Sequence, residues 1–170
     1  MLKRHIPTFH AQNVYEIDLN KLVDLHIKYV FCDLDNTLDS YRQKTPSPRA
    51  VELVKKLKEL GIELIVVSNN TGPRVEKYAS KLGVTYFSRI GKPFPRKLNK
   101  IILEKGYSKD EIIIIGDQVV TDISFANKAG IKNILCEKLV KEDQPTTHFN
   151  RLFDRPLRRS LRKKNLLKEF

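Results

Sequence analysis

Cysteine and histidine are scarce in this sequence, and their scarcity excludes several kinds of site. Among 170 residues there are 2 cysteines and 4 histidines. Cys32 and Cys136 form no CxxC pair and lie inside apolar runs, which predicts buried, reduced thiols rather than a disulfide or a zinc site. The histidines show no metal-ligand spacing. A metal centre built from nitrogen or sulfur ligands is therefore not expected.

Long apolar runs are also missing. None approaches the roughly 20 residues that a membrane-spanning helix needs. The opening residues, MLKRHIPTFH, lack the apolar stretch of a signal peptide, so we expect a cytoplasmic protein. Tyrosine and phenylalanine are scattered, without the aromatic pattern of an RNA-reading module.

Acidic residues are outnumbered by basic ones. Lys and Arg total 32 against 20 Asp and Glu, which gives a formal net charge of +12 and a pI of about 9.7. This charge favours anionic partners, namely phosphates, nucleic acid or an acidic membrane surface.

Half of the excess charge lies in residues 151–170, which carry eight basic and two acidic side chains. Leu157 and Leu161 share a helical face, whereas Leu166 falls on the opposite side of a continuing helix. Without one apolar stripe, a helix lying in a membrane surface is not predicted. The open alternatives are peripheral contact with an anionic membrane, contact with RNA, and a solvated tail. We expect the segment to affect location rather than chemistry.

The apolar residues that are present, 41% of the chain, suffice for one domain with its own core. Strand-like apolar runs alternate with amphipathic helical stretches, which is typical of a parallel sheet covered on both faces. The predicted strands span residues 28–33, 62–68, 84–88, 111–117 and 132–137. We therefore predict an α/β three-layer sandwich with about five parallel strands.

Three segments are expected along the chain. Residues 1–27 form an N-terminal extension whose short helix is capped by Asp18 and packs on the core. Residues 28–140 form the main domain, and residues 141–170 form the basic C-terminal segment.

Polar side chains follow four of the predicted strands at the points where the strands end. The clusters are Asp33-Leu34-Asp35-Asn36-Thr37, Ser68-Asn69-Asn70, Lys92-Pro93, and Gly116-Asp117-Gln118 running on to Thr121-Asp122. Because ligands of open parallel sheets bind at the carboxyl ends of the strands, one shared pocket is expected. A single Asp after a strand is more often a turn or capping residue, but several converging carboxylates need a cation to offset their charge. Oxygen ligands without nitrogen suit Mg²⁺.

The four clusters, in this order, resemble the motifs of the haloacid dehalogenase (HAD) superfamily of phosphatases. The matching positions are Asp33, Asp35 and Thr37 in the first motif, Ser68 in the second, Lys92 in the third, and Asp117 and Asp122 in the fourth. The stretches DLDNTL, SNN, GKP and GDQxxTD are similar to subfamily IIIA, and especially to the YqeG-type phosphatases. That branch is related to the mitochondrial phosphatidylglycerophosphate phosphatases.

The resemblance implies a HAD-like Rossmannoid fold and a Mg²⁺-dependent phosphate-monoester hydrolase. Asp33 would form an aspartyl-phosphate, and Asp35 would act as general acid and base. Dehalogenases of the superfamily lack the second acid, so Asp35 favours phosphate transfer. The phosphate-binding residues would be Thr37, Ser68, Asn69 and Lys92. The metal ligands would be Asp33, Asp35 through its backbone carbonyl, Asp117 and Asp122.

The spacing of the motifs leaves no room for a cap domain. The 31 residues from Thr37 to Ser68 and the 24 from Ser68 to Lys92 are already occupied by predicted elements. An open pocket suits a phosphate on something large, such as a lipid headgroup at a membrane, a protein or a nucleic acid, or a small ester if a neighbouring subunit serves as lid. Among these, the resemblance to the related family implies phosphatidylglycerophosphate as a substrate, with a soluble phosphate ester as the alternative. The competing hypothesis is a weakly catalytic RNA- or ribosome-associated protein that uses its basic tail, and the presence of both Asp33 and Asp35 argues against it.

Overall fold

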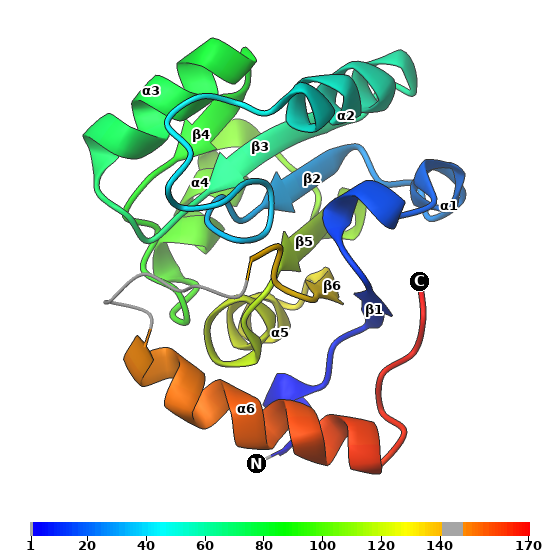
Figure 1. The fold of residues 1–170 in the computed structure, drawn as a ribbon. Coiled ribbons are helices and arrows are strands. Elements are labelled where there is room, and N and C mark those ends of the chain that lie inside the picture. The colour runs from blue at the N-terminus through cyan, green and yellow to red at the C-terminus, as the bar shows by residue number, and fades with distance from the viewer. Residues whose placement is uncertain (1, 141–147) are drawn as a thin grey trace.

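The computed structural model describes residues 2–140 and 148–170, which form one six-stranded parallel sheet with helices on both faces (Figure 1). The strands are β1 (Phe9–Ala11), β2 (Tyr29–Cys32), β3 (Glu63–Val67), β4 (Thr85–Phe87), β5 (Ile112–Gly116) and β6 (Lys132–Cys136). The sheet order is β1-β6-β5-β2-β3-β4, and every pair of neighbours is parallel. The predicted α/β architecture is confirmed, with one strand more than expected.

The additional strand, β1, comes from the N-terminal extension. Phe9 lies opposite Ile134 of β6, so β1 extends the sheet at its edge. Three residues are too few for an alternating pattern to stand out in a sequence, and the strand therefore escaped prediction.

Helices alternate with the strands, as the sequence suggested, and one more helix, α6, follows the last strand. They are α1 (Leu19–Asp24), α2 (Pro48–Glu59), α3 (Gly72–Leu82), α4 (Arg96–Lys105), α5 (Ser124–Ala129) and α6 (His148–Lys163). Short 3-10 turns lie at Leu2–His5 (η1), Val14–Glu16 (η2) and Lys109–Glu111 (η3), and a π-helical segment at Val119–Ile123 (η4) precedes α5.

Local signals explain where several helices begin and end. The side chain of Asp18 accepts a hydrogen bond from the amide of Asn20 and caps α1. The Ser47 hydroxyl accepts one from the amide of Ala50 at 3.2 Å and caps α2, with Pro48 in the first turn. Gly83 ends α3 at φ 73°, in the left-handed region that favours glycine.

Two apolar layers hold the helices to the sheet. On one face, side chains of α1, α2 and α3 pack on one set of strand residues, including Val30 and Ile115. On the other face, α4 and α5 pack on the alternate set, including Phe31 and Ile114. Successive strand residues point to opposite faces, so a doubly covered strand must be apolar throughout.

The strand order reverses direction between β2 and β5. The chain runs from β2 to β3 and β4 on one side, then returns to place β5 on the other side of β2. This reversal between β2 and β5 is the switch point at which open α/β sheets bind ligands. In the described part of the chain, the intervals between the motifs hold α2, β3, α3 and β4, and no cap domain is present.

The C-terminal segment packs on the domain rather than trailing from it. Leu161 of α6 is 1% exposed and contacts Val119, Ile123 and Leu135. The sequence placed Leu166 on the opposite side from Leu161, and this was wrong because the helix ends at Lys163. The chain then turns back, and Leu166 reaches the same apolar cluster.

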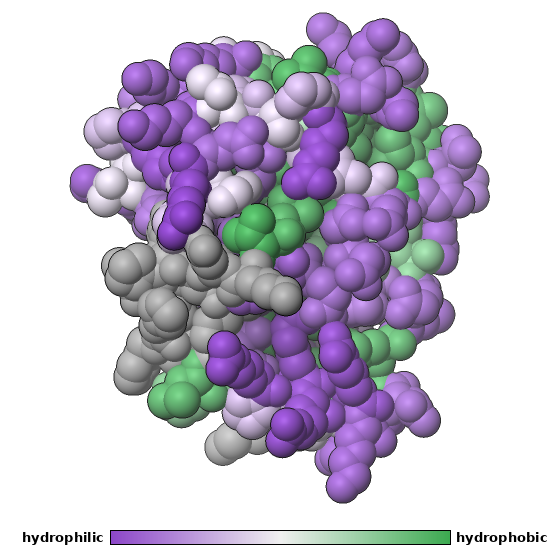
Figure 2. All heavy atoms as spheres, viewed as in Figure 1, coloured by the Kyte–Doolittle hydropathy of each residue, from purple (hydrophilic) through white to green (hydrophobic). Residues whose placement is uncertain are grey.

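The last residues run beside β1. The amide of His10 donates to the carbonyl of Lys168 at 2.7 Å, and the amide of Phe170 donates to the carbonyl of His10 at 2.9 Å. The Phe170 ring meets the Phe9 ring edge-on, with 5.0 Å between centroids. Largely hydrophilic side chains cover the outer surface where α6 lies (Figure 2). The interpretation of this segment as a solvated tail is therefore corrected for residues 152–170. Within the described ranges, no helix is long and apolar enough to cross a membrane.

Candidate active site

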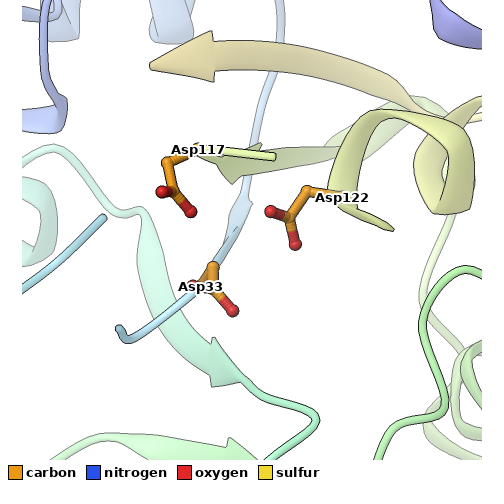
Figure 3. A group of neighbouring side chains, drawn as sticks. All are labelled: Asp33, Asp117 and Asp122. Atoms are coloured by element: carbon orange, nitrogen blue, oxygen red, sulfur yellow. The ribbon is translucent and has the colours of Figure 1, made fainter. Parts of the chain in front are cut away.

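Three carboxylates converge at the switch point. Asp33 follows β2, Asp117 follows β5, and Asp122 lies in η4. One oxygen of each lies within 4.8 Å of the others, and the three side chains point into one shared space (Figure 3). Asp117 and Asp122 are 0% and 1% exposed. Buried carboxylates this close together repel one another, so the site requires a compensating positive charge.

Lys92 supplies part of that charge. Its Nζ lies 2.7 Å from an oxygen of Asp33 and 2.7 Å from an oxygen of Asp122. Burial opposes the charged ammonium, but the carboxylates of Asp122 and Asp33 outweigh burial and raise the pKa of Lys92. Burial raises the pKa of the Asp33 carboxyl well above its usual range, with Lys92 opposing and Asp122 and Asp117 adding to the rise. Three carboxylates and one ammonium leave a net negative charge that a divalent cation would neutralise.

A close approach between backbone and side chain places Asp122. A Cβ atom on Gly116 would lie 2.3 Å from the Cγ atom of Asp122, a distance that real atoms do not adopt. The backbone amide of Gln118 donates at 3.0 Å to the Asp122 oxygen that does not pair with Lys92. The missing side chain at Gly116 therefore allows the Asp122 carboxylate to lie against the end of β5.

The chemistry of this donor set fits a hard divalent cation. The ligating atoms available are carboxylate oxygens, without histidine or cysteine. Such sets favour Mg²⁺, Ca²⁺ or Mn²⁺ over softer metals. In the part of the chain that the structure describes, no other group of three His, Cys, Asp or Glu side chains comes this close together.

Asp35 faces a different set of partners. Arg74 donates to one of its carboxylate oxygens and Asn70 donates to the other. Arg74 also donates to the carbonyl of Gln43 at 3.3 Å, so it links Asp35 to the loop that precedes α2. The sequence prediction missed both partners. A usable signal was present, because Asn70 belongs to the second polar cluster and Arg74 lies in the first turn of the helix that follows it.

The remaining predicted phosphate-binding residues surround the acid cluster. Ser68 is 3% exposed, and its hydroxyl accepts from the amide of Asn70 at 3.1 Å. The side chain of Asn69 holds the Lys92 loop. Its Oδ1 accepts a hydrogen bond from the backbone amide of Lys92 at 2.8 Å, and its Nδ2 donates to the backbone carbonyl of Lys92 at 2.9 Å. The hydroxyl of Thr37 donates to Asp117 at 3.4 Å. The sheet thus brings all eight predicted residues to one edge, and direct contact of any of them with phosphate stays a prediction.

The C-terminal helix also reaches this region, which sequence reasoning did not foresee. Arg158 donates to the backbone carbonyls of Asp117 and Cys136. Asp154 is 1% exposed, accepts from the amides of Val119 and Val120, and pairs with Arg158 at 3.0 Å. The sequence offered one signal of this arrangement: the spacing of four residues between Asp154 and Arg158, which allows an ion pair on one face of a helix.

The contacts of Asp35 lead to a prediction about leaving groups. We expect Asp35→Asn to slow hydrolysis of an alkyl phosphate by about a hundredfold, because a poor leaving group needs a proton. In kcat/KM, which reports formation of the aspartyl-phosphate, nitrophenyl phosphate should lose less than about tenfold, because its leaving group needs little protonation. Arg74→Met should also slow hydrolysis of the alkyl phosphate more than that of nitrophenyl phosphate, but by smaller factors, because Arg74 positions Asp35. Steady-state kinetics on both esters checks this, with Lys81→Gln on α3 as an exposed control. Equal losses of kcat/KM on the two esters would remove Asp35 from protonation of the leaving group.

A parallel α/β sheet with an acid cluster at its switch point defines a Rossmann-like enzyme fold. The profile of haloacid dehalogenase-like hydrolases matches residues 9–130. The chain belongs to this family and is a phosphatase, as the resemblance implied. It is similar to Probable phosphatase YqeG of Bacillus subtilis, with 32% identity over 165 residues that cover 96% of each chain.

Two further relatives are more distant. Phosphatidylglycerophosphate phosphatase 1 of Arabidopsis thaliana is 25% identical over 150 residues, which cover 82% of this chain and 43% of that protein. The cobalt-bound deoxy-D-mannose-octulosonate 8-phosphate phosphatase of Haemophilus influenzae shares 20% identity and a TM-score of 0.52, over 69% of this chain and 81% of that one. This last likeness supports the fold alone.

Proposed function

We propose that the protein hydrolyses phosphate monoesters in a Mg²⁺-dependent reaction through an aspartyl-phosphate on Asp33. The observation that carries this proposal is the convergence of Asp33, Asp117 and Asp122 around the Lys92 ammonium at the switch point. The two acids of the first motif, Asp33 and Asp35, supply a nucleophile and a proton donor from a single loop.

The chain's own residues account for the steps of the reaction. A carboxylate oxygen of Asp33 attacks phosphorus, the bond to the ester oxygen breaks, and Asp35 protonates the leaving alcohol. Asp35 then takes a proton from a water molecule, which attacks the aspartyl-phosphate and releases inorganic phosphate. Lys92 stabilises the negative charge on the phosphoryl oxygens.

The acid cluster would hold the cation. Asp33, Asp117 and Asp122 would bind Mg²⁺, together with the backbone carbonyl of Asp35. When bound, the cation supplies positive charge that offsets repulsion between Asp33 and the incoming phosphate.

A lipid phosphate is the substrate that we favour. The support is the similarity to a phosphatidylglycerophosphate phosphatase and the lack of a cap over the site in the described residues. A cytoplasmic enzyme that touches an anionic membrane peripherally through its exposed basic residues fits this substrate. No observation favours the RNA- or ribosome-associated alternative, since the relatives reported above are phosphatases.

Metal removal tests the proposed function. We expect EDTA to lower hydrolysis of nitrophenyl phosphate by at least about a hundredfold, and excess Mg²⁺ to restore it. Asp117→Ala should reproduce the loss without rescue by Mg²⁺, because it removes an oxygen ligand. The initial rates of wild type and variant are measured across a Mg²⁺ titration. Full activity in the chelated enzyme would contradict a metal-dependent mechanism.

A further inference from the structure

A basic pocket lies on the flank of the acid cluster. Its volume is about 580 Å³, and three cationic side chains line it: Lys3 and Arg4 of η1, and Lys128 of α5. None of the described residues that line it is acidic. The pocket therefore presents concentrated positive charge to whatever enters it.

The pocket is lined in part by close sequence neighbours of candidate active-site residues. Pro93, which lines it, directly follows Lys92. Val120 and Ser124 also line it, and they lie two residues before and after Asp122. The same two backbone segments therefore carry active-site side chains and line the pocket.

The fold holds the cationic residues in place. The side-chain amide of Asn127 donates to the carbonyl of Arg4 at 3.1 Å and to the carbonyl of Ile6 at 2.9 Å, which ties η1 to α5. The Nζ of Lys128 donates to the carbonyl of Pro93 at 3.2 Å, so this cation is fixed to the Lys92 loop.

The cations of the pocket have no acidic partner within the described chain. Lys3, Arg4 and Lys128 form no ion pair with the acidic side chains that the structure describes. Lys128 also lies 4.9 Å from the ring centroid of Phe94, whose side chain is 69% exposed. A cluster of cations without counter-charges, beside an exposed ring, suits a ligand with an anionic group and some apolar surface.

We infer that this pocket is a subsite for a second phosphate of the substrate, separate from the phosphoryl group that is transferred. The inference rests on the proposed function, because it takes the acid cluster as the site of the transferred group. The substrate class is then a phosphomonoester joined through a short linker to another phosphate. A soluble bisphosphate and a lipid headgroup both offer this chemistry.

Paired substrates test the subsite. Glycerol bisphosphate and glycerol monophosphate differ only in the second phosphate, so the ratio of their kcat/KM values reports the subsite. We expect the double substitution Arg4→Gln and Lys128→Gln to lower this ratio by about tenfold relative to wild type. Lys81→Gln, which removes an exposed charge on α3 outside the pocket, should leave the ratio unchanged. The wild-type preference should also fall as salt rises, because exposed charges are screened.

A lipid arm distinguishes the two sources of the second phosphate. A lipid whose headgroup carries a monoester and a diester is presented in detergent micelles, in parallel with soluble glycerol bisphosphate. A higher kcat/KM for the micellar lipid than for soluble glycerol bisphosphate identifies a lipid headgroup as the substrate. The reverse order identifies a free bisphosphate. Either preference must depend on Arg4 and Lys128 for the inference to hold.

A binding measurement separates failure of the subsite from failure of the proposed function. Calorimetry of glycerol bisphosphate with the Asp33→Asn protein, with and without the pocket substitutions, requires no turnover. Weaker binding in the pocket variant supports the subsite even if hydrolysis is never observed. An unchanged dissociation constant, or no wild-type preference for the second phosphate, overturns it.

Discussion

Substitution of Asp33 by Asn is expected to lower hydrolysis of nitrophenyl phosphate by at least about 10⁴-fold, because it removes the nucleophile and a metal ligand together. The fold should persist. Burial raises the pKa of the Asp33 carboxyl, so its ionised form costs folding free energy in the metal-free protein. A neutral amide removes that cost. We therefore expect a Tm equal to or above that of wild type.

Chemical trapping connects this variant to the mechanism. Borohydride reduces an aspartyl-phosphate to homoserine, so wild-type protein quenched during turnover should yield a peptide with homoserine at position 33. The Asp33→Asn protein should yield none. Near wild-type turnover in the variant, or homoserine at another position, would show that the assigned nucleophile is wrong.

Substitution of Arg158 by Met is expected to produce the largest loss of stability among single changes near the site. The Arg158 guanidinium pairs with Asp154 and with Glu137, each at 3.0 Å. Removing it takes a paired cation away from the nearly inaccessible Asp154 carboxylate, which costs about 3 kcal/mol. For a chain of this size the Tm should fall by roughly 10 °C.

Arg158 should also influence metal binding. It donates to the backbone carbonyl of Asp117, whose side chain belongs to the acid cluster. We expect Arg158→Met to raise the Mg²⁺ concentration needed for half-maximal activity several-fold at a temperature where the variant is folded. A purely structural role would lower Tm and leave this concentration unchanged.

A neighbouring arginine provides the matched control. Arg159 is exposed on the same helix, so Arg159→Met removes the same charge without touching Asp154. Its Tm and Mg²⁺ dependence should match wild type. In the double variant Asp154→Asn and Arg158→Met, the loss of stability should be smaller than the sum of the single losses, because the two residues share one interaction. Additive losses would contradict the pairing.

The sequence determined the architecture and the chemical groups of the site. Apolar strands that alternate with amphipathic helices are typical of a covered parallel sheet, and the spacing between Thr37, Ser68 and Lys92 left no room for a cap. The identity of the acids followed as well, because carboxylates placed directly after apolar strands must meet at the carboxyl edge of the sheet. These features depend on local pattern and on a topology with few alternatives.

Only the tertiary structure decided which groups from distant segments meet. Arg74 reaches Asp35 across 39 positions of sequence, and Arg158 reaches the Asp117 carbonyl across 41. The three-residue strand β1 exists because β6 offers it a free edge, and Leu166 joins the core because α6 ends before it. Such contacts depend on long-range packing, which leaves no periodic trace in the chain. For the same reason, sequence reasoning assigned the basic C-terminal segment a role in location alone, whereas in the structure α6 packs against η4 and contacts the backbone of Asp117.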